Sequence, residues 1–387
     1  MRILGKGKTA QAIKQVYPEA QMFDDQDKDI YDCDSDEQTI VSPGIPPHNY
    51  LVQNTHNIQS DYDLFLNEDN FTIWISGTNG KTTTTQMIDH LLKDKGFLCG
   101  GNIGTPLATI AKDQTSKKLI LETSSFTLHY TNKARPNIYI LLPISEDHIS
   151  WHGTFSEYEQ SKLKPLSMMK ENDIAIIPNK YKGIRTNCTM YTYKNSKDLA
   201  AHFEIELDKI KFKEPFLLDS LLALCVEKIL NDEISYEKIN RFIQDPHKIE
   251  EFKDLKKRVW VDDSKATNID ATIQAVDTYK TKKIFLILGG DDKGADMKPL
   301  FEYLQAKDII IYCIGSNAQK LYDLSERYNI KANKCIELEK AVEMIFYNKE
   351  FTQESIAMLS PAAASLDQFT SYKHRGEAFK KAISQKK

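Results

Sequence analysis

The sequence predicts an α/β protein with three domains, each built on a parallel sheet. We expect a small Rossmann-like amino-terminal domain, a central P-loop mononucleotide-binding domain and a Rossmann-like carboxy-terminal domain. Short apolar, β-branched runs alternate with helical patterns along most of the chain, which is typical of βαβ units. The 387 residues also exceed the ~250–300 at which a single core stops growing. The expected domains are residues 1–69, 70–245 and 246–387.

The composition argues against several classes of protein. Hydrophobic residues make up 41% of the chain and charged residues 27%, as in soluble globular proteins. A net charge of −4 gives no support to a general role in nucleic-acid binding. We find no apolar run of the ~20 residues that a membrane helix needs, and the first residues do not resemble a signal peptide. The six cysteines are scattered, without metal-binding spacing. We therefore expect a cytoplasmic protein with reduced thiols.

The first domain should begin with a very short strand, a Gly5-Lys-Gly7 turn and a helix to about Val16. An ordinary βα turn explains a lone Gly-x-Gly as well as a ligand loop does. Residues 19–37 hold nine acidic side chains against Lys28 alone, which is typical of a solvated face. Asp24 is a possible exception, because an acid at the end of the second strand can accept a hydrogen bond from a ribose or uracil.

A further strand and a rigid turn follow in Thr39-Ile-Val-Ser-Pro-Gly-Ile-Pro-Pro47. The backbone amides around Ser42 and Gly44 are candidates for contact with a diphosphate. Only polar residues near 67–70 mark the boundary with the next domain.

The strongest motif begins in a short apolar run and reads Ile73-Trp-Ile-Ser-Gly-Thr-Asn-Gly-Lys-Thr-Thr-Thr-Thr85. Helix-forming residues from 86 to 95 follow, so the order is strand, tight loop, helix. Backbone N–H groups and the helix N-terminus would face a phosphate, Lys81 would add a charge, and Thr82 would offer a hydroxyl to Mg²⁺. The P-loop match is incomplete, because Ile75 stands where its first glycine belongs. A chance Gly-Lys-Thr in a surface turn is the alternative, but the flanking strand and helix favour nucleotide phosphate binding.

Charged and polar side chains follow two further predicted strands, residues 118–125 and 138–143. Glu122, Asp147 and His148 would lie at the carboxyl ends of these strands, where ligands gather in open α/β sheets. A carboxylate at such a place is often only the edge of a sheet. Because several strand ends converge on one phosphate loop, we favour a metal–nucleotide site.

Two helices are predicted in the rest of the central domain. One starts at Phe155, with Ser156 as its N-cap and Glu159 at N3. Its lysines, Lys162 and Lys164, would ordinarily be solvated, and composition does not distinguish them. The other, Phe216–Asn231, is apolar and should lie in the core.

The third domain should hold a second doubly wound sheet, with strands near 258–263, 283–288, 309–314 and 356–359. Lys265, Lys293 and Ser365 follow three of these strands and would lie at the ligand-facing rim. A lone lysine at a strand end is usually solvated. Two of them beside loops of small residues, in a chain with a P-loop, favour an anionic substrate.

Several motifs follow one another in order along nearly the whole chain. They are Gly77-Thr-Asn-Gly-Lys-Thr-Thr83, Glu122-Thr-Ser-Ser-Phe126, Glu146-Asp-His148, Asp263-Ser-Lys-Ala-Thr-Asn268, Gly289-Gly-Asp-Asp-Lys293 and Ser360-Pro-Ala-Ala-Ala-Ser-Leu-Asp-Gln-Phe369. Together they resemble the motifs of Mur ligases, the ATP-dependent amino-acid ligases of peptidoglycan synthesis. The first motif is shared with folylpolyglutamate synthases, whereas the last three resemble the D-glutamate-adding branch.

The resemblance implies a reaction. The ATP γ-phosphate would pass to the lactoyl-alanine carboxylate of UDP-N-acetylmuramoyl-L-alanine. The amine of D-glutamate would then attack the acyl phosphate, giving an amide, ADP and phosphate through a tetrahedral intermediate. A carboxylate does not accept an amine until one of its oxygens becomes a leaving group, and cations must hold the anionic reactants together.

The resemblance also implies roles for particular residues. The catalytic group would be Lys81, Glu122, His148 and Lys162, with Mg²⁺ at two sites. Thr82 and Glu122 would ligate one metal, and His148 with a carbamylated Lys162 would ligate the second. The ATP contacts would be Gly77, Thr78, Asn79, Gly80, Lys81, Thr82, Thr83, Asp219, His247, Lys248, Asp263 and Asn268. The UDP-sugar contacts would be Lys8, Thr9, Asp24, Ser42, Pro43, Gly44 and Asn102, and the D-glutamate contacts would be Lys265, Thr267, Lys293, Ser365, Leu366 and Tyr372.

The sequence departs from the family in three places. Lys248 stands where the family usually has arginine, and the usual His-Asn-x-x-Asn reads Pro215-Phe-Leu-Leu-Asp219, so only Asp219 keeps a polar group for the adenine side. The first domain is also short, at about 69 residues. We expect a monomer whose last domain closes on ATP. The alternatives are another Mur or folylpolyglutamate-type ligase, a P-loop regulator that changes partners on hydrolysis, and a catalytically dead binding module.

Overall fold

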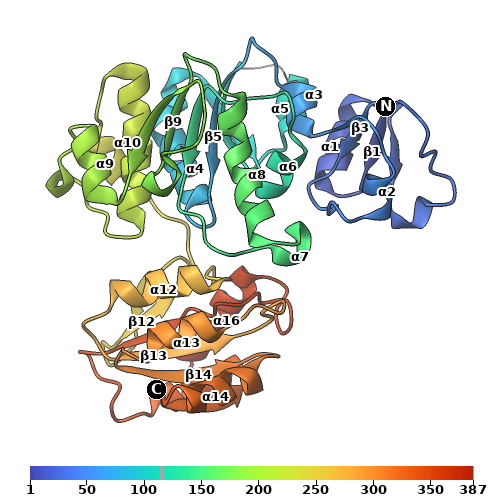
Figure 1. Cartoon of the computed structure of the whole chain (residues 1–387). Helices are drawn as coiled ribbons and strands as arrows, with labels where there is room; N and C mark the ends of the chain where they lie inside the picture. Colours follow the sequence, from blue (N-terminus) through green and yellow to red (C-terminus); the bar gives the residue numbers. More distant parts are fainter. Residues whose placement is uncertain (114–116, 387) are drawn as a thin grey trace. The chain divides into compact units, whose positions relative to one another are not determined.

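The computed structural model describes residues 1–113 and 117–386, and in them the predicted α/β class is confirmed. Three sheets carry the fold of this part of the chain (Figure 1). The chain forms two compact units, Met1–Phe242 and Ile243–Lys387. The first two sheets belong to the first unit and the third sheet to the second. The domain boundaries predicted at residues 69 and 245 remain predictions.

The amino-terminal sheet is parallel and has the order β2-β1-β3-β4. Its strands are β1 (Arg2–Leu4), β2 (Gln21–Phe23), β3 (Thr39–Val41) and β4 (Ile58–Gln59). Its helices are α1 (Lys8–Val16), η1 (Asp25–Asp27), α2 (Tyr50–Gln53) and α3 (Asp61–Phe65). This sheet is tied to the central one by apolar packing of α1 around Ala108 and by the Tyr130 hydroxyl, which donates to Ile45 O at 2.8 Å.

The central sheet is parallel throughout and has the order β10-β9-β8-β5-β7-β6. Its strands are β5 (Phe71–Ser76), β6 (Phe97–Gly101), β7 (Lys118–Glu122), β8 (Ile138–Leu141), β9 (Ile174–Pro178) and β10 (Thr189–Tyr193). Its helices are α4 (Lys81–Leu92), η2 (Lys93–Lys95), α5 (Leu107–Asp113), α6 (Ser125–Tyr130), α7 (Ile149–His152), α8 (Phe155–Met168), η3 (Asn179–Tyr181), α9 (Ser196–His202), η4 (Leu207–Lys209), α10 (Phe216–Asn231) and α11 (Tyr236–Asn240).

Both faces of the central sheet are covered, which explains why its strands are apolar runs rather than alternating patterns. Helices α4, α9 and α10 pack on one face, and α5, α6 and α8 pack on the other. Fully burying each Leu or Ile side chain contributes about 1.5–3 kcal/mol. The core therefore fixes strand β5 and helix α4, which flank the phosphate loop.

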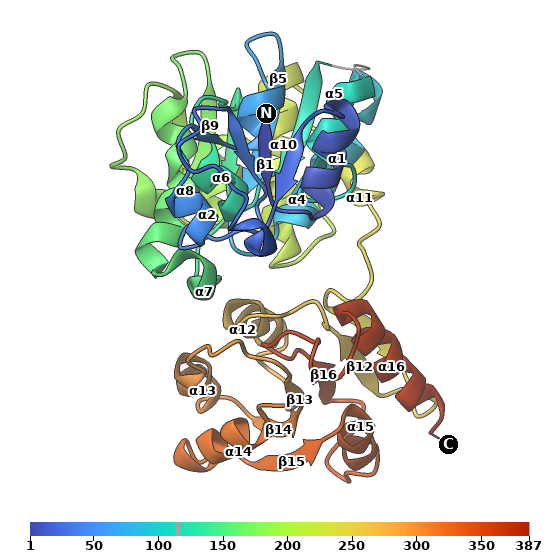
Figure 2. The same ribbon diagram turned by 90° about the vertical axis from the view of Figure 1, so that its right-hand side faces the viewer.

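The third sheet is mixed, with the order β11-β12-β16-β13-β14-β15 and an antiparallel edge strand β11. Its strands are β11 (Glu250–Lys253), β12 (Val259–Asp262), β13 (Ile284–Gly289), β14 (Ile309–Ile314), β15 (Ala332–Ile336) and β16 (Ile356–Leu359). Its helices are α12 (Ile269–Thr278), α13 (Lys298–Leu304), α14 (Ala318–Arg327), α15 (Leu338–Phe346) and α16 (Tyr372–Ser384). Helices α12, α13 and α14 cover one face, and α15 and α16 cover the other (Figure 2).

One predicted helix cap and one predicted helix start were wrong, although the helix predicted from Phe155 does begin there. Helix α8 is capped by Thr154, whose hydroxyl accepts from Glu157 N at 3.2 Å, so Ser156 lies inside the helix. Helix α4 begins at Lys81 rather than near residue 86. Its β-branched threonines have modest helix propensity, but three of them are buried in the core, and tertiary packing decides their conformation.

The structure also bears on the membrane and thiol expectations. No helix within residues 1–113 and 117–386 is long and apolar enough to cross a membrane. The cysteines in this part of the chain are all free thiols.

Candidate nucleotide and substrate sites

The phosphate loop is a tight turn between β5 and α4. Gly77 has φ 138°, and a Cβ there would lie 2.5 Å from Leu142 Cβ. Gly80 has φ 84°, and a Cβ there would lie 2.5 Å from Asp219 Oδ1. Only glycine fits both positions, which leaves the backbone of the loop free to approach a ligand. Asn79 completes the turn.

Lys81 lies at the first position of α4 and folds back over the loop. Its ammonium donates to Gly77 O at 3.0 Å and to Thr78 O at 2.7 Å. Burial lowers the pKa of Lys81, and the charges of Glu122 and Asp147 partly oppose this. The site thus combines an ammonium with the positive end of a 12-residue helix, and both favour the binding of an anion.

Glu122, at the end of β7, joins two other predicted residues. Thr82 Oγ1 donates to Glu122 Oε2 at 2.8 Å, and Asn102 Nδ2 donates to Glu122 Oε1 at 2.8 Å. The Glu122 side chain is nearly inaccessible, with 2% exposure. A carboxylate and a hydroxyl beside a phosphate loop are the oxygen ligands that Mg²⁺ prefers, so these residues fit the metal.

Lys162, on α8, reaches the same loop from the other side. It is 1% exposed, and its Nζ donates to Gly77 O at 2.7 Å and contacts Ser76 Oγ at 3.4 Å. Burial holds the pKa of Lys162 well below its ordinary value, and the nearby charge of Lys81 lowers it further. The sequence did not distinguish Lys162 from Lys164, but the structure does, because Lys164 Nζ turns to His129 O at 2.8 Å.

His148 is the N-cap of α7 and has a left-handed conformation, with φ 55°. Its ring lies 4.8 Å from the ring of Phe126 and 6.1 Å from that of Tyr158. Lys162 Nζ lies 4.8 Å from the centroid of the same Tyr158 ring. Both proposed ligands of the second metal therefore lie around Tyr158. As a plain ammonium Lys162 does not fit a metal site, whereas a carbamate would.

Sequence reasoning missed Tyr158. Its side chain is 1% exposed, and its hydroxyl makes a 2.9 Å hydrogen bond with Thr78 Oγ1. Ser145 N also donates to Thr78 Oγ1, at 3.0 Å. Tyr158 thus attaches α8 to the phosphate loop. A tyrosine at a core-facing helical position gives no sequence signal for this role.

Asp219 supports the phosphate loop from α10. Thr84 Oγ1 donates to Asp219 Oδ1 at 3.0 Å, and Asp219 is 3% exposed. Thr83, also buried, lies in the same first turn of α4. Asp219 thus contacts α4, and its role toward adenine remains a prediction.

The residues predicted for the UDP end gather at the carboxyl ends of β1, β2 and β3. Ser42 Oγ is buried and has no hydrogen-bond partner in the described residues, as expected of a group that awaits a ligand. Lys8 and Thr9 form the first turn of α1, and Pro43 and Gly44 follow Ser42. Asp24 Oδ1 accepts from Gln26 N at 3.0 Å.

Lys6 was not predicted, although it lies inside the Gly-x-Gly turn. Its ammonium lies 3.1 Å from Asp24 Oδ2 and 2.7 Å from Asp27 Oδ2. These carboxylates raise the pKa of Lys6. The acidic stretch is therefore more than a solvated face, because part of it orients a lysine at the candidate UDP site.

The residues predicted for D-glutamate lie on loops after β12, β13 and β16, except Tyr372, which is the first residue of α16. Lys265, Thr267, Lys293 and Leu366 are exposed, and Ser365 is buried. Lys265 Nζ lies 4.6 Å from the centroid of the Tyr372 ring. Two cationic side chains at one sheet rim can attract an acidic amino acid.

Asp263 and Asn268 lie on the loop between β12 and α12. Asp263 is buried and accepts from Ser360 Oγ at 2.7 Å and from Ile249 N at 3.2 Å. Burial raises the pKa of Asp263 to about 8. Asn268 caps α12, since its side chain accepts from Ala271 N at 3.0 Å.

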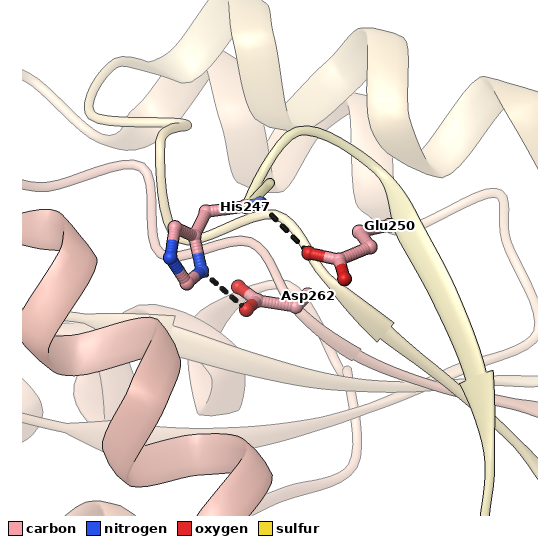
Figure 3. A group of neighbouring side chains, drawn as sticks. All are labelled: His247, Glu250 and Asp262. Atoms are coloured by element: carbon pink, nitrogen blue, oxygen red, sulfur yellow. Dashed lines mark hydrogen bonds and ion pairs between the residues drawn. The ribbon is translucent and has the colours of Figure 1, made fainter. Parts of the chain in front are cut away.

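His247 lies inside the second unit, in a polar network with Asp262 and Glu250 (Figure 3). His247 Nδ1 lies 2.6 Å from Asp262 Oδ2, and His247 N donates to Glu250 Oε2 at 3.0 Å. Lys380 Nζ lies 2.6 Å from Glu250 and 3.6 Å from Asp262. Lys380 therefore places a positive charge beside both carboxylates. Lys248 pairs with Asp245 at 3.2 Å.

Known proteins resemble this chain in sequence. Residues 75–215 match the model of the Mur ligase middle domain. A UDP-N-acetylmuramoylalanine–D-glutamate ligase of Campylobacter jejuni (strain RM1221) is 51% identical over 345 residues, covering 89% of this chain and 85% of that protein. A protein of the same name from Helicobacter pylori (strain HPAG1) is 43% identical and covers 98% of each chain.

Solved structures share the fold. The MurF ligase of Thermotoga maritima in complex with ADP superposes with a TM-score of 0.58 at 16% identity, over 98% of this chain and 93% of that one. E. coli FolC in complex with DHPP and ADP gives a TM-score of 0.54 at 13% identity, over 80% and 88% of the two chains.

These features define a P-loop nucleotide-binding protein: a tight glycine loop, Lys81 and the Thr82–Glu122 pair at the end of a parallel sheet. Two further β-sheets, each covered by helices, belong to the same chain. The chain belongs to the Mur ligase family, among the proteins named UDP-N-acetylmuramoylalanine–D-glutamate ligase.

Proposed function

We propose that this chain joins D-glutamate to UDP-N-acetylmuramoyl-L-alanine with ATP, through an acyl phosphate, releasing ADP and phosphate. The observation that carries the proposal is the cluster at the phosphate loop, where Glu122 holds both Thr82 and Asn102 beside Lys81. Asn102, which we propose contacts the muramoyl substrate, and Thr82, which we propose ligates the metal of the nucleotide, thus donate to the same carboxylate. The names of the relatives supply the identities of the substrates.

The first half of the reaction needs positive charge at the γ-phosphate. Lys81 and the N-terminus of α4 would neutralise the charge that develops on the phosphoryl oxygens. Asn102 would orient the acceptor, so that its carboxylate attacks in line. Mg²⁺ held by Thr82 and Glu122 would polarise the phosphoryl oxygens.

We also propose that Lys162 is carbamylated, because it is buried and lies close to Lys81. A neutral amine is the form that reacts with CO₂, and burial disfavours the ammonium of Lys162. Both Lys81 and Lys162 donate to Gly77 O, at 3.0 and 2.7 Å. A carbamate would replace the repulsion between these ammonium groups with attraction. It would also give the second metal an oxygen ligand beside His148.

The ends of the reactants would be held by the other two sheets. Ser42, with its unpartnered hydroxyl, would bind the UDP end together with Lys8 and Asp24. Lys265 and Lys293 would pair with the carboxylates of D-glutamate. Contacts of His247 and Lys248 with the nucleotide, location in the cytoplasm and a monomeric state remain parts of this proposal.

The proposal is tested by omitting substrates one at a time. ATP with UDP-N-acetylmuramoyl-L-alanine and Mg²⁺ should yield an acyl phosphate that hydroxylamine traps as a hydroxamate, and D-glutamate should convert it to the amide. Mass spectrometry identifies both products. Amide formation with no trappable hydroxamate would argue against the acyl phosphate. ATP turnover indifferent to the acceptor would indicate a P-loop regulator instead.

A further inference from the structure

We propose that Arg375 is a positioning residue for the amino-acid pocket, because its guanidinium holds together the three loops that carry the proposed D-glutamate contacts. Arg375 lies in the first turn of α16. The inference deepens the proposed function and rests on it, since the pocket is assigned there. It concerns the second unit alone.

Two of the loops are bound directly. Arg375 Nε and Nη2 donate to Ser264 Oγ and Ser264 O, both at 2.9 Å. Nη2 also donates to Ala363 O at 3.0 Å, and Nη1 donates to Ala364 O at 3.3 Å. Ser264 directly precedes Lys265, and Ala364 directly precedes Ser365. Each loop is therefore anchored one residue before a proposed substrate contact.

The third loop is attached through Ala364. Asp291 N donates to Ala364 O at 2.9 Å, and Ala364 N donates to Asp291 O at 2.8 Å. Gly290 is packed so closely that a Cβ there would lie 2.3 Å from Ala364 O and 3.2 Å from Arg375 Nη1. Lys293 belongs to this loop, so a shift of Ala364 would move Lys293 too.

The charge of Arg375 strengthens these contacts. The side chain is 1% exposed, and burial lowers its pKa only to about 10, so the guanidinium stays charged at neutral pH. Its hydrogen-bond acceptors are neutral loop oxygens rather than carboxylates. Hydrogen bonds from a charged donor are about twice as strong as neutral ones. The buried charge of Arg375 thus holds the backbone of Ser264, Ala363 and Ala364 in place at the ligand-facing rim.

Ser264 also links Arg375 to Tyr372, the aromatic residue among the proposed D-glutamate contacts. Its hydroxyl accepts from Arg375 and donates to Tyr372 O at 2.8 Å. Loss of the guanidinium would therefore release the backbone on which Lys265 and Tyr372 depend. Misplacing a substrate contact by 1 Å can cost about 100-fold in rate.

The test compares substitutions at two buried arginines of the second unit, in the full chain. R375M removes the guanidinium, and R375K keeps a charge of similar reach. R258M is the matched control. Arg258 is 5% exposed, pairs with Asp254 at 2.8 Å and donates to Phe346 O, but it precedes β12 and so lies at the opposite end of that strand from the rim.

R375M should raise the KM for D-glutamate about tenfold or more, while the KM for the acceptor stays at its original value. The KM for ATP should rise less than that for D-glutamate, because Asp263, a proposed ATP contact, directly precedes the anchored Ser264. R375K keeps the charge and should therefore raise the KM for D-glutamate less than R375M does. It also replaces R375M in the test if R375M does not fold. R258M should lower the melting temperature without changing the KM for D-glutamate.

Equal changes in all three KM values or an equal rise in R258M would overturn the inference. So would an unchanged KM for D-glutamate in folded R375M, or in R375K where R375M does not fold. Failure of the unsubstituted protein to use D-glutamate would instead refute the proposed function on which it rests.

Discussion

Two lysines donate to one backbone oxygen at the phosphate loop, and this arrangement has consequences at the scale of single residues. Lys81 and Lys162 both reach Gly77 O, and burial lowers the pKa of each. Lys81 has a phosphate to neutralise in the proposed reaction, whereas an ammonium at Lys162 would repel both Lys81 and a metal. The neutral or carbamylated form of Lys162 resolves this conflict.

Carbamylation can be observed directly. With ¹³C-bicarbonate, the protein should give a ¹³C carbamate resonance that disappears in Lys162→Ala. Lys164→Ala is the matched control, because Lys164 lies on the same helix but donates to His129 O and Asn132 Oδ1, both at 2.8 Å. A resonance that survives Lys162→Ala, or a plain ammonium at Lys162 in Mg²⁺-loaded crystals, would contradict the proposal.

Asp61 gives a prediction about pH. Its carboxyl is 7% exposed, Oδ1 has no hydrogen-bond partner in the described residues, and burial raises its pKa from 3.8 to about 7. As the pH rises, Asp61 ionises in the unfolded chain before it ionises in the folded protein, which favours unfolding. The contribution of protonated Asp61 to the free energy of unfolding is therefore complete below pH 3.8 and is lost as the pH rises to about 7.

Asp61→Asn should therefore be more stable than the original chain near neutral pH, by at most about 4 kcal/mol, with the difference shrinking as the pH falls. Calorimetry across this pH range measures it. Asp69→Asn, whose original side chain is 72% exposed, should show no such pH dependence. A stability difference for Asp61→Asn that is independent of pH would contradict the assignment.

The sequence predicted residues that belong to local motifs and missed those that act through tertiary contacts. Lys81, Thr82 and Glu122 follow strands in recognisable patterns, and the structure places them together. Tyr158 lies 80 residues from Thr78, and Arg375 lies 111 residues from Ser264. Nothing in the sequence near either residue indicates its partner, so only the folded chain reveals these roles.

At the scale of elements, the pairing of α4 with α10 supports the phosphate loop. The predicted apolar helix Phe216–Asn231 is confirmed as α10, because its apolar side chains fill the core against α4. The start of α4 was missed, since threonine-rich sequence gives a weak helix signal. The polar link between the two helices, from Thr84 to Asp219, was likewise not apparent from the sequence.

Asp219→Leu tests this link. It removes the acceptor of the fully buried Thr84 hydroxyl, which should lower the free energy of unfolding by about 1–3 kcal/mol. The KM for ATP should rise, because Asp219 also packs against Gly80. Asp219→Asn keeps an acceptor and should behave nearly as the original chain. Chemical denaturation and steady-state kinetics measure both, and equal effects of Leu and Asn would contradict the role of the hydrogen bond.

At the scale of the whole molecule, the proposed functional residues are divided between two compact units. The ATP loop, Glu122 and Lys162 belong to Met1–Phe242, and the proposed amino-acid contacts belong to Ile243–Lys387. Alternation of strands and helices was enough to predict the three sheets. The antiparallel strand β11 was not predicted, because its four residues are mostly charged.

The junction between the units should be the preferred site of limited proteolysis. Ile243 is 88% exposed, and Arg241 and Lys248 lie on either side of it. Brief trypsin treatment should give two fragments, and the isolated first fragment should bind ATP without forming the amide. Mass spectrometry and isothermal titration measure these outcomes. Amide formation by the first fragment alone would contradict the assignment of D-glutamate to the second unit.

The central claim is most directly tested by phosphate release from ATP and Mg²⁺ with UDP-N-acetylmuramoyl-L-alanine, when D-glutamate, L-glutamate, L-lysine or diaminopimelate is added in turn. We predict release with D-glutamate alone, reduced about 100-fold or more in Lys81→Ala but not in Lys93→Ala, at the other end of the same helix. Release only with another amino acid would contradict the proposed specificity, and equal release by Lys81→Ala would contradict the proposed site.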